Sequence, residues 1–292
     1  MKGGWHSLCK AFFMRRPCLI AILAFAGLGA HAAGTVLTEI PFESREGLLW
    51  LKAKAFPSGE SLNLLLDTGA GISVLNTAAA ERLGLNRGRA ITVRGVESTL
   101  AGHSLKPVSL TAEGIPLPAI RFAVDLHPFS DSCALPVDGL LGADFFRGRI
   151  VQIDFEAKKL RILATSPARQ NADSIPLQLR PCGMRVPIQV NGGHSQWVRL
   201  DTGCLSALQW VTSSVRSEDC SQKAAIGLTQ ISIPQIDTTV EIGSQKFGQV
   251  PTGIHEKPIF MGEAGLLGNG LLSRFSRLTI DAKSGRLILE SR

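Results

Sequence analysis

The 292-residue sequence lacks the patterns that mark several large functional classes. It has no H-E-x-x-H pattern, and its histidines after residue 32 show no metal-ligand spacing, so we expect no metal and no cofactor. It has no G-x-S-x-G motif, which argues against a hydrolase with a nucleophilic serine. Gly268-Asn-Gly270 lacks the third glycine of a dinucleotide-binding motif. Lysine and arginine do not cluster with aromatic residues, which argues against nucleic-acid binding. The histidines concerned are His103, His127, His194 and His255.

The first 32 residues have the layout of a cleaved secretory signal. Four basic residues and no acid occur before residue 17, and an uncharged apolar run follows at 19–30. Small residues at alternate positions, Ala30 and Ala32, are typical of a cleavage site. A membrane anchor is the alternative, but a spanning helix needs about 20 apolar residues. We therefore expect export to the periplasm or the medium, with no stable membrane insertion after cleavage.

Loss of residues 1–32 would change both the charge and the cysteine count. Four of the 31 basic residues would leave, so 27 basic and 24 acidic residues would give a net charge of +3. Four cysteines would remain, and in an exported chain they permit two disulfides in any of three pairings. We expect Cys204 to form a disulfide, with Cys220 as a candidate partner, and a reactive thiol is the alternative. The four cysteines are Cys133, Cys182, Cys204 and Cys220.

The most informative feature is an internal duplication. Asp67-Thr-Gly and Asp201-Thr-Gly each follow an apolar, strand-like run. Four further matches occur in the same order around these motifs, at nearly the same spacing. They are Ile40-Pro-Phe with Ile175-Pro-Leu, Gly139-Leu-Leu-Gly with Gly265-Leu-Leu-Gly, Phe145-Phe146 with Leu271-Leu272, and Ile153-Asp154 with Ile280-Asp281. The pattern predicts two homologous lobes at residues 35–163 and 174–292, joined by a polar linker at 164–173.

Most segments within each lobe have the alternation of short strands. Residues 48–55 end in such alternation, and residues 184–190 precede Asn191-Gly192, a strong hairpin signal. The clearest helix is predicted at residues 77–83, where Gly84 ends it. We therefore predict an all-β fold of two homologous β-barrel lobes with a cleft between them and few short helices.

The two Asp-Thr-Gly motifs form the predicted site. One copy alone is weak, because Asp and Gly are common in turns. Two copies at equivalent points of related lobes meet at the axis between the lobes, where Asp67 and Asp201 would face each other. Two close carboxylates cannot both ionise cheaply, so they share a proton and can activate a water for attack on a peptide carbonyl. Threonine hydroxyls that cross the lobe junction, and glycines that let backbone N–H groups approach, would support the pair. These supporting residues are Thr68, Gly69, Thr202 and Gly203.

The motifs resemble those of the retropepsin-like aspartic peptidases. The resemblance rests on the apolar-apolar-Asp-Thr-Gly-Ala pattern at Asp67 and on Gly139-Leu-Leu-Gly-Ala-Asp-Phe-Phe, which looks like the bacterial members. It implies two retropepsin-like barrels, a catalytic pair of Asp67 and Asp201, and hydrolysis of a polypeptide substrate. It also implies that Leu140-Leu141 and Leu266-Leu267 pack beneath the site. Two copies in one chain imply an active monomer, as in pepsins, whereas the retroviral members assemble two chains.

The sequence also departs from the pepsin pattern. It has no tyrosine, which excludes a flap tyrosine of the pepsin type. Candidate flaps lie at 93–103 and 226–235, where an extended peptide would bind by strand pairing. Asp138 and Glu263, each close before a Gly-Leu-Leu-Gly, are interpreted as structural. The alternative from another class is a non-catalytic protein that binds a polypeptide or an envelope polymer on the same fold.

Neither Asp-Thr-Gly is followed by a hydroxyl side chain. Pepsin-like relatives often carry Ser or Thr at this position, and a donor to the ionised carboxylate lowers its pKa. Here the positions are Ala70 and Cys204. We therefore expect the pair to keep its shared proton to a higher pH, with an optimum nearer weakly acidic than strongly acidic conditions.

Overall fold

The computed structural model shows a mostly β chain, which confirms the predicted fold class. The strands form three sheets, and the helices of the described residues are short. No helix in the described part of the chain is long and apolar enough to cross a membrane. The predicted signal segment lies outside the described residues. The structure describes residues 34–95, 99–130, 133, 135–167, 173–212, 221–226 and 230–292.

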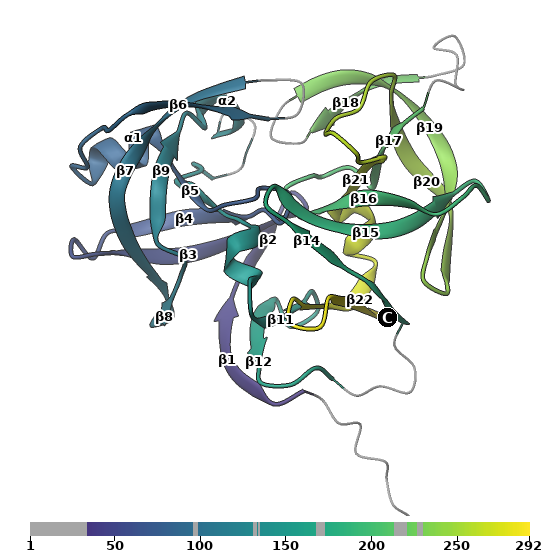
Figure 1. Ribbon diagram of the computed structural model, residues 1–292, viewed down its shortest axis with the longest axis horizontal. Coiled ribbons are helices and arrows are strands. Elements are labelled where there is room, and N and C mark those ends of the chain that lie inside the picture. The colour runs from purple at the N-terminus through teal and green to yellow at the C-terminus, as the bar shows by residue number, and fades with distance from the viewer. Residues whose placement is uncertain are drawn as a thin grey trace, which may run out of the picture. The chain divides into compact units, whose positions relative to one another are not determined.

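The first sheet, drawn from purple to teal in Figure 1, contains strands of the N-terminal half. Its strand order is β2-β3-β4-β10-β5-β9-β7-β6, with β8 paired to β7. The pairs β4–β10 and β5–β9 are parallel. The strands are β2 (Glu43–Arg45), β3 (Leu48–Phe56), β4 (Ser61–Leu66), β5 (Val74–Asn76), β6 (Ala90–Arg94), β7 (Thr99–Ala112), β8 (Ile115–Pro116), β9 (Ile120–Val124) and β10 (Gly139–Leu141). The helices of this half are α1 (Thr77–Arg82), α2 (His127–Ser130) and the 3-10 helix η1 (Ala143–Phe146).

The second sheet, largely green in Figure 1, repeats this arrangement in the C-terminal half. Its order is β14-β15-β16-β21-β17-β20-β19-β18, so each strand has a counterpart at the same place in the first sheet. The equivalent pairs β16–β21 and β17–β20 are again parallel. The elements are β14 (Gln178–Arg180), β15 (Gly183–Val190), β16 (Gln196–Asp201), β17 (Leu208–Val211), β18 (Ser221–Ile226), β19 (Gln230–Ile242), β20 (Gln245–His255), β21 (Gly265–Gly268) and helix α3 (Asn269–Leu272). The sequence duplication therefore has a counterpart in topology.

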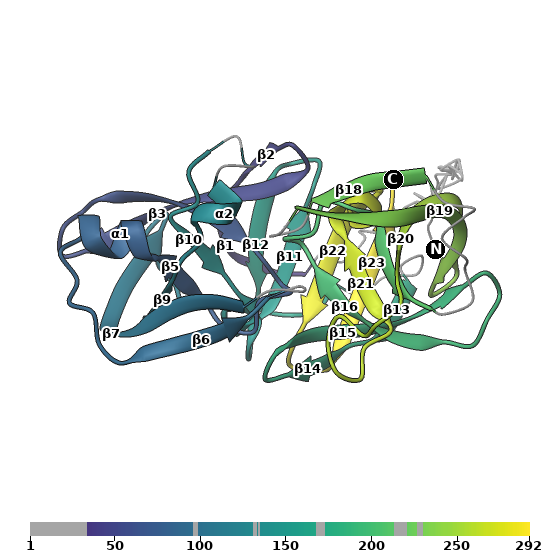
Figure 2. The same ribbon diagram turned by 90° about the horizontal axis from the view of Figure 1, so that it is seen from above.

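The third sheet takes strands from both halves of the chain. Its order is β1-β12-β11-β22-β23-β13, and Figure 2 shows β11 beside β22 at its centre. In that antiparallel pair Gln152 lies opposite Thr279. The strands are β1 (Val36–Pro41), β11 (Ile150–Asp154), β12 (Lys159–Leu163), β13 (Asp173–Pro176), β22 (Phe275–Asp281) and β23 (Arg286–Ser291). The predicted domain boundaries stay a prediction, and β11–β22 is where this sheet passes from one half to the other.

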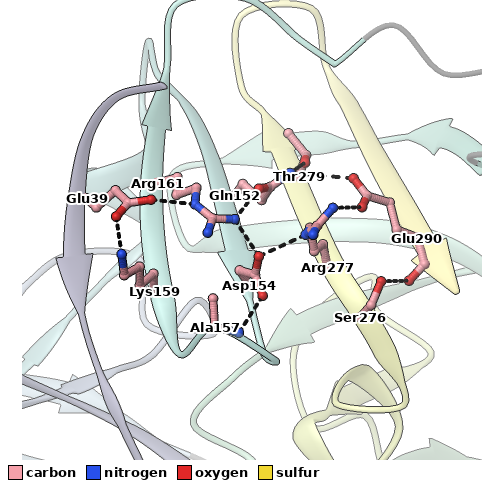
Figure 3. Close-up of polar contacts among 10 residues, drawn as sticks. All are labelled: Glu39, Gln152, Asp154, Ala157, Lys159, Arg161, Ser276, Arg277, Thr279 and Glu290. Atoms are coloured by element: carbon pink, nitrogen blue, oxygen red, sulfur yellow. Dashed lines mark hydrogen bonds and ion pairs between the residues drawn. The ribbon is translucent and has the colours of Figure 1, made fainter. Parts of the chain in front are cut away.

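An ion-pair network crosses the third sheet (Figure 3). The buried carboxylate of Asp154 accepts from Nε of Arg277 at 2.8 Å and also pairs with Arg161. Arg161 bonds Glu39 on β1 at 2.7 Å, and Arg277 bonds Glu290 on β23 at 3.2 Å. Burial acts to raise the pKa of Asp154, but a backbone N–H donor and the two arginines hold the pKa below its usual value. Both halves of the chain are thus joined by charge as well as by backbone hydrogen bonds.

Local sequence signals account for two predicted elements. The side chain of Asn76 caps α1 by accepting from the N–H of Ala78, and Gly84 follows the helix with a φ of 67°. Asn191 and Gly192 turn the chain between β15 and β16 with φ angles of 51° and 69°. These left-handed values suit Asn and Gly, so the predicted hairpin forms at this dipeptide.

Candidate functional site

Asp67 and Asp201 lie at the ends of two equivalent strands. Asp67 directly follows β4, and Asp201 is the last residue of β16. Each strand runs parallel to the short strand of a Gly-Leu-Leu motif, β10 or β21. The N–H of Asp67 donates to the carbonyl of Leu141 at 3.0 Å, and Asp201 lies in register with Gly268. The neighbouring strand therefore fixes the start of each Asp-Thr-Gly loop.

The two threonines join the loops by reciprocal hydrogen bonds. The hydroxyl of Thr68 donates to the carbonyl of Leu200 at 2.7 Å, and that of Thr202 donates to the carbonyl of Leu66 at 2.8 Å. Each hydroxyl also accepts from the backbone N–H of the other threonine, at 3.0 and 3.1 Å. We call these four hydrogen bonds the threonine cross. Both side chains are fully buried, so all four bonds are shielded from water. The cross fixes the two loops in one arrangement.

The two glycines let each loop approach the opposite carboxylate. A Cβ on Gly69 would lie 2.5 Å from Cγ of Asp201, and one on Gly203 would lie 2.7 Å from Cγ of Asp67. Real Cβ atoms do not make such contacts, so any larger residue would push a carboxylate away. The requirement for glycine is therefore a consequence of the close pairing of Asp67 with Asp201.

The paired carboxyls are buried, at 1% exposure for Asp67 and 9% for Asp201. Burial raises the pKa of both, and the charge of Asp67 raises the pKa of Asp201 further. No donor among the described groups reaches Oδ2 of Asp67, although the two side chains are within hydrogen-bonding reach. A proton on Asp201 would give the carboxyl of Asp67 a further donor. The geometry therefore suits one proton shared by the pair.

Backbone donors distinguish the two carboxyls. Asp67 accepts from the N–H of Ala70 at 3.0 Å, and the N–H of Gly69 also acts to lower the pKa of Asp67, whereas Asp201 accepts from the N–H of Gly203 at 2.9 Å. Hydrogen bonds to a carboxylate favour its ionised form. The arrangement therefore favours Asp67 as the ionised member and Asp201 as the protonated member.

The cysteine after the second motif is a neutral thiol. Burial raises the pKa of Cys204 to about 12, and its sulfur lies 3.0 Å from Oγ of Ser206. Such a thiol has little nucleophilic character at neutral pH. Cys133, Cys182 and Cys204 are free, so no disulfide joins any two of them, and the candidate partner Cys220 lies outside the described residues.

Arg199 is a functional candidate that the sequence prediction missed. It lies two residues before Asp201 on β16, on the same face of the strand, and its side chain is buried. It bonds both carboxylate oxygens of Glu263, at 2.7 and 2.9 Å, and donates to the carbonyl of Gly69 at 3.0 Å. Its guanidinium lies 3.5 Å from the ring centre of Phe260. The signal in the sequence that could have identified Arg199 is the presence of an arginine in an apolar strand that leads to Asp201.

A cleft of about 900 Å³ opens above the paired carboxyls. The N-terminal half contributes mainly apolar side chains, which include Ile72, Val93 and Leu100. The C-terminal half contributes more polar groups. They are Arg185, Arg199, Gln209 and His255. The first predicted flap falls in the β6–β7 hairpin and lines this cleft, and the second falls in the equivalent β18–β19 hairpin.

The remaining predicted residues have structural contacts. Leu140 and Leu266 line the cleft, while Leu141 and Leu267 belong to the core. Asp138 accepts from the N–H of Asn63 and from Arg82, each at 2.8 Å, which agrees with a structural role. Glu263 is held between Arg185 and Arg199. His255 bonds Gln209 at 2.7 Å, and no group that could hold a metal is found among the described residues.

Comparisons with known proteins agree with this architecture. Residues 56–148 match the family described as "gag-polyprotein putative aspartyl protease". Among solved structures, the fold is similar to an aspartic proteinase from Irpex lacteus, with a TM-score of 0.59 and 13% sequence identity. That alignment covers 87% of this chain and 97% of the other. No curated protein sequence matches the chain significantly. The family match is confined to residues 56–148, and the structural match shows that the chain as a whole has the fold of an aspartic proteinase.

Proposed function

We propose that the chain is an aspartic endopeptidase that cleaves polypeptides with Asp67 and Asp201. The observation that carries the proposal is the buried pair of carboxyls, locked by the threonine cross at the floor of a large cleft. General acid–base chemistry needs one group that accepts a proton and one that donates, and this pair supplies both.

In the proposed reaction, a water between the carboxyls is the nucleophile. Ionised Asp67 takes a proton from this water, which attacks the carbonyl carbon of the peptide bond. Protonated Asp201 donates to the carbonyl oxygen, which gives a tetrahedral gem-diol. The C–N bond then breaks as Asp67 passes the proton from the water to the leaving nitrogen and Asp201 takes a proton back from one hydroxyl of the gem-diol. The fixed loops keep both carboxyls in position, so little reorganisation accompanies the reaction.

The cleft supports an extended polypeptide as the substrate. Residues of the β6–β7 hairpin line the cleft, and β6 is an edge strand that can pair with a peptide backbone. The apolar wall of the N-terminal half suits an apolar substrate side chain, because burial of such a group stabilises binding by about 25 cal/mol per Å². A folded substrate would not expose such a strand, so we propose unfolded segments as the preferred target.

One chain supplies both carboxyls, and we therefore propose an active monomer exported to the periplasm or the medium. An active monomer keeps its specific activity on dilution, whereas an enzyme assembled from two chains loses activity as it dissociates. Export predicts a mature N-terminus near Ala33 by mass spectrometry of the protein from its host. A chain that keeps residues 17–32 in the membrane fraction would favour the anchor instead.

The test is a cleavage assay on a denatured, fluorescently labelled protein between pH 3 and pH 8. Wild-type chain should release peptides, and Asp67→Asn should release none while its circular dichroism spectrum stays unchanged. A non-catalytic binding protein on the same fold is the second candidate. It would bind the denatured protein with similar affinity in both forms and would cleave it in neither.

A further inference from the structure

The two halves differ sharply at one pair of equivalent positions beside the carboxyls. In the C-terminal half, Arg199 and Glu263 lie two residues before Asp201 and two before Gly265. Their counterparts in the N-terminal half are Leu65 and Val137, which are buried in one apolar cluster. A buried ion pair thus occupies the place of an apolar contact. Replacement of a buried ion pair by apolar residues is often neutral or stabilising, so stability alone does not explain the pair.

The contacts of Arg199 join three parts of the site. Its guanidinium donates to the carbonyl of Gly69 in the first Asp-Thr-Gly loop, which comes from the opposite half of the chain. Through Glu263 and Phe260 it holds the loop that leads into β21 and lines the cleft. Through β16 it is fixed two residues from Asp201. Its equivalent, Leu65, has no polar group with which to make such contacts.

We propose that Arg199 is a positioning residue that orients the first Asp-Thr-Gly loop and places a fixed positive charge beside the carboxyl pair. The proposal rests on the proposed function, because it assigns a role in the same reaction. A nearby cation stabilises the ionised form of a carboxyl, so Arg199 should let the pair lose a proton at a lower pH. Glu263 limits this effect by neutralising part of the charge.

The charge of Arg199 acts to lower the pKa of both Asp67 and Asp201, against the larger effect of burial. Cys204 is neutral beside them. The other charged or titratable groups that line the cleft or support Arg199 come from several elements. They are Arg94 at the end of β6, Cys182 just before β15, Arg185 on β15, His255 on β20, and Glu263 before β21.

The decisive variant gives the C-terminal half the apolar pair of the other half, as Arg199→Leu with Glu263→Val. In the full-length chain, both limbs of the kcat/KM–pH profile should move upward by about half to one pH unit. Folding should be retained, because an equivalent apolar pair already packs in the first half. If the double variant is folded and both limbs of its kcat/KM–pH profile lie at the wild-type pH, the proposal is overturned.

Two single variants should move the limbs in opposite directions. Arg199→Met should move them upward and lower kcat more than it changes KM, because the Gly69 contact is lost. Glu263→Gln should move them downward, since the charge of Arg199 is then less neutralised. Arg199→Lys keeps the charge and should restore the limbs to near their wild-type positions. Shifts of the same sign in Arg199→Met and Glu263→Gln would contradict the electrostatic role.

Arg82→Met is the matched control, because Arg82 pairs with Asp138 in the N-terminal half away from the carboxyls. Its limbs should stay at the wild-type pH. If wild-type chain cleaves no substrate, the proposed function fails separately. The titration of the Asp67 and Asp201 carboxyls, followed by carbon-13 NMR in the same variants, then still tests Arg199: unshifted titrations would overturn its role.

Discussion

Two sets of buried carboxyls in this molecule have opposite properties. Asp154 in the shared sheet meets two arginines, and its pKa is held below the usual value. Asp67 and Asp201 meet each other, and their pKa values are raised. All three side chains are almost inaccessible to water, so burial alone does not decide their charge. The partners decide it: the arginines favour the ionised form of Asp154, whereas a second carboxyl beside Asp67 and Asp201 favours a shared proton.

The largest expected effect is a loss of activity, which should follow substitution of Asp67 or Asp201 but not of Asp154. Asp67→Asn and Asp201→Asn should each lower kcat/KM by about 10³-fold or more, because neither proton acceptor nor proton donor can be replaced by an amide. Thermal unfolding should show no loss of stability, since neither change adds a buried charge. Asp154→Asn is the control and should keep kcat/KM within about two-fold of wild type. Near-normal turnover in either variant of the pair would exclude the shared mechanism.

The second prediction concerns stability, for which Asp154 should matter more than Asp67 or Asp201. Asp154→Asn should lower the free energy of unfolding by about 2–4 kcal/mol, because Arg161 and Arg277 lose their shared carboxylate. Denaturant unfolding at pH 7 measures this difference. The reverse pattern, in which Asp201→Asn costs more stability than Asp154→Asn, would show that the two sets have been assigned the wrong roles.

The third prediction concerns the pH dependence of stability, which should have opposite signs at the two sites. The folded pKa of Asp154 is lowered, so its stabilising contribution is present above the unfolded pKa of about 3.9 and is lost as pH falls through the folded pKa. The folded pKa of Asp201 is raised, so its contribution is present below about pH 3.9 and is lost as pH rises through the folded pKa.

Unfolding free energies measured from pH 3 to pH 8 test both signs. Asp154→Asn should flatten the loss of stability at the acid end, and Asp201→Asn should flatten the loss on the way to neutral pH. A variant at either site that flattens the opposite end would contradict the assignment of its pKa shift.

The smallest predicted effect comes from the residue after the first motif. Ala70 follows Gly69 and already donates its N–H to Asp67, so a hydroxyl at position 70 would add a second donor nearby. Ala70→Ser should move the acid limb of the kcat/KM–pH profile downward by a few tenths of a pH unit, about the effect of one extra neutral hydrogen bond. The same profile for Cys204→Ser, on the other side, is the matched comparison. An upward shift in Ala70→Ser would exclude this role for the donor.

Much of the fold was predictable from the sequence because the duplication is visible in short motifs. The two Asp-Thr-Gly and two Gly-Leu-Leu-Gly copies predict equivalent strands, and the strand orders of the first two sheets are indeed the same. The hairpin at Asn191-Gly192 was predictable because those residues tolerate left-handed backbone angles. Strand pairing across the chain, as in β11 with β22, depends on tertiary contacts that no local pattern specifies.

The site was only partly predictable for a related reason. Asp67, Thr68 and their counterparts could be placed by repetition, since both copies carry them. Arg199 and Glu263 could not, because they differ from their counterparts and lie 64 residues apart. A charged residue in an apolar strand marks an unusual position, but its partner is known only once the strands are assembled. Asymmetric features of a duplicated site are therefore the ones that a search for repeats overlooks.

The central claim is that Asp67 and Asp201 share one proton, and carbon-13 NMR of the aspartate carboxyls tests it most directly. Chain labelled at the aspartate side-chain carboxyl carbon should be titrated from pH 3 to pH 8, with the two resonances assigned from Asp67→Asn and Asp201→Asn. We predict that the pair keeps one proton at pH 6 while Asp154 is fully ionised. Two ionised carboxyls at Asp67 and Asp201 at pH 6 would contradict the account.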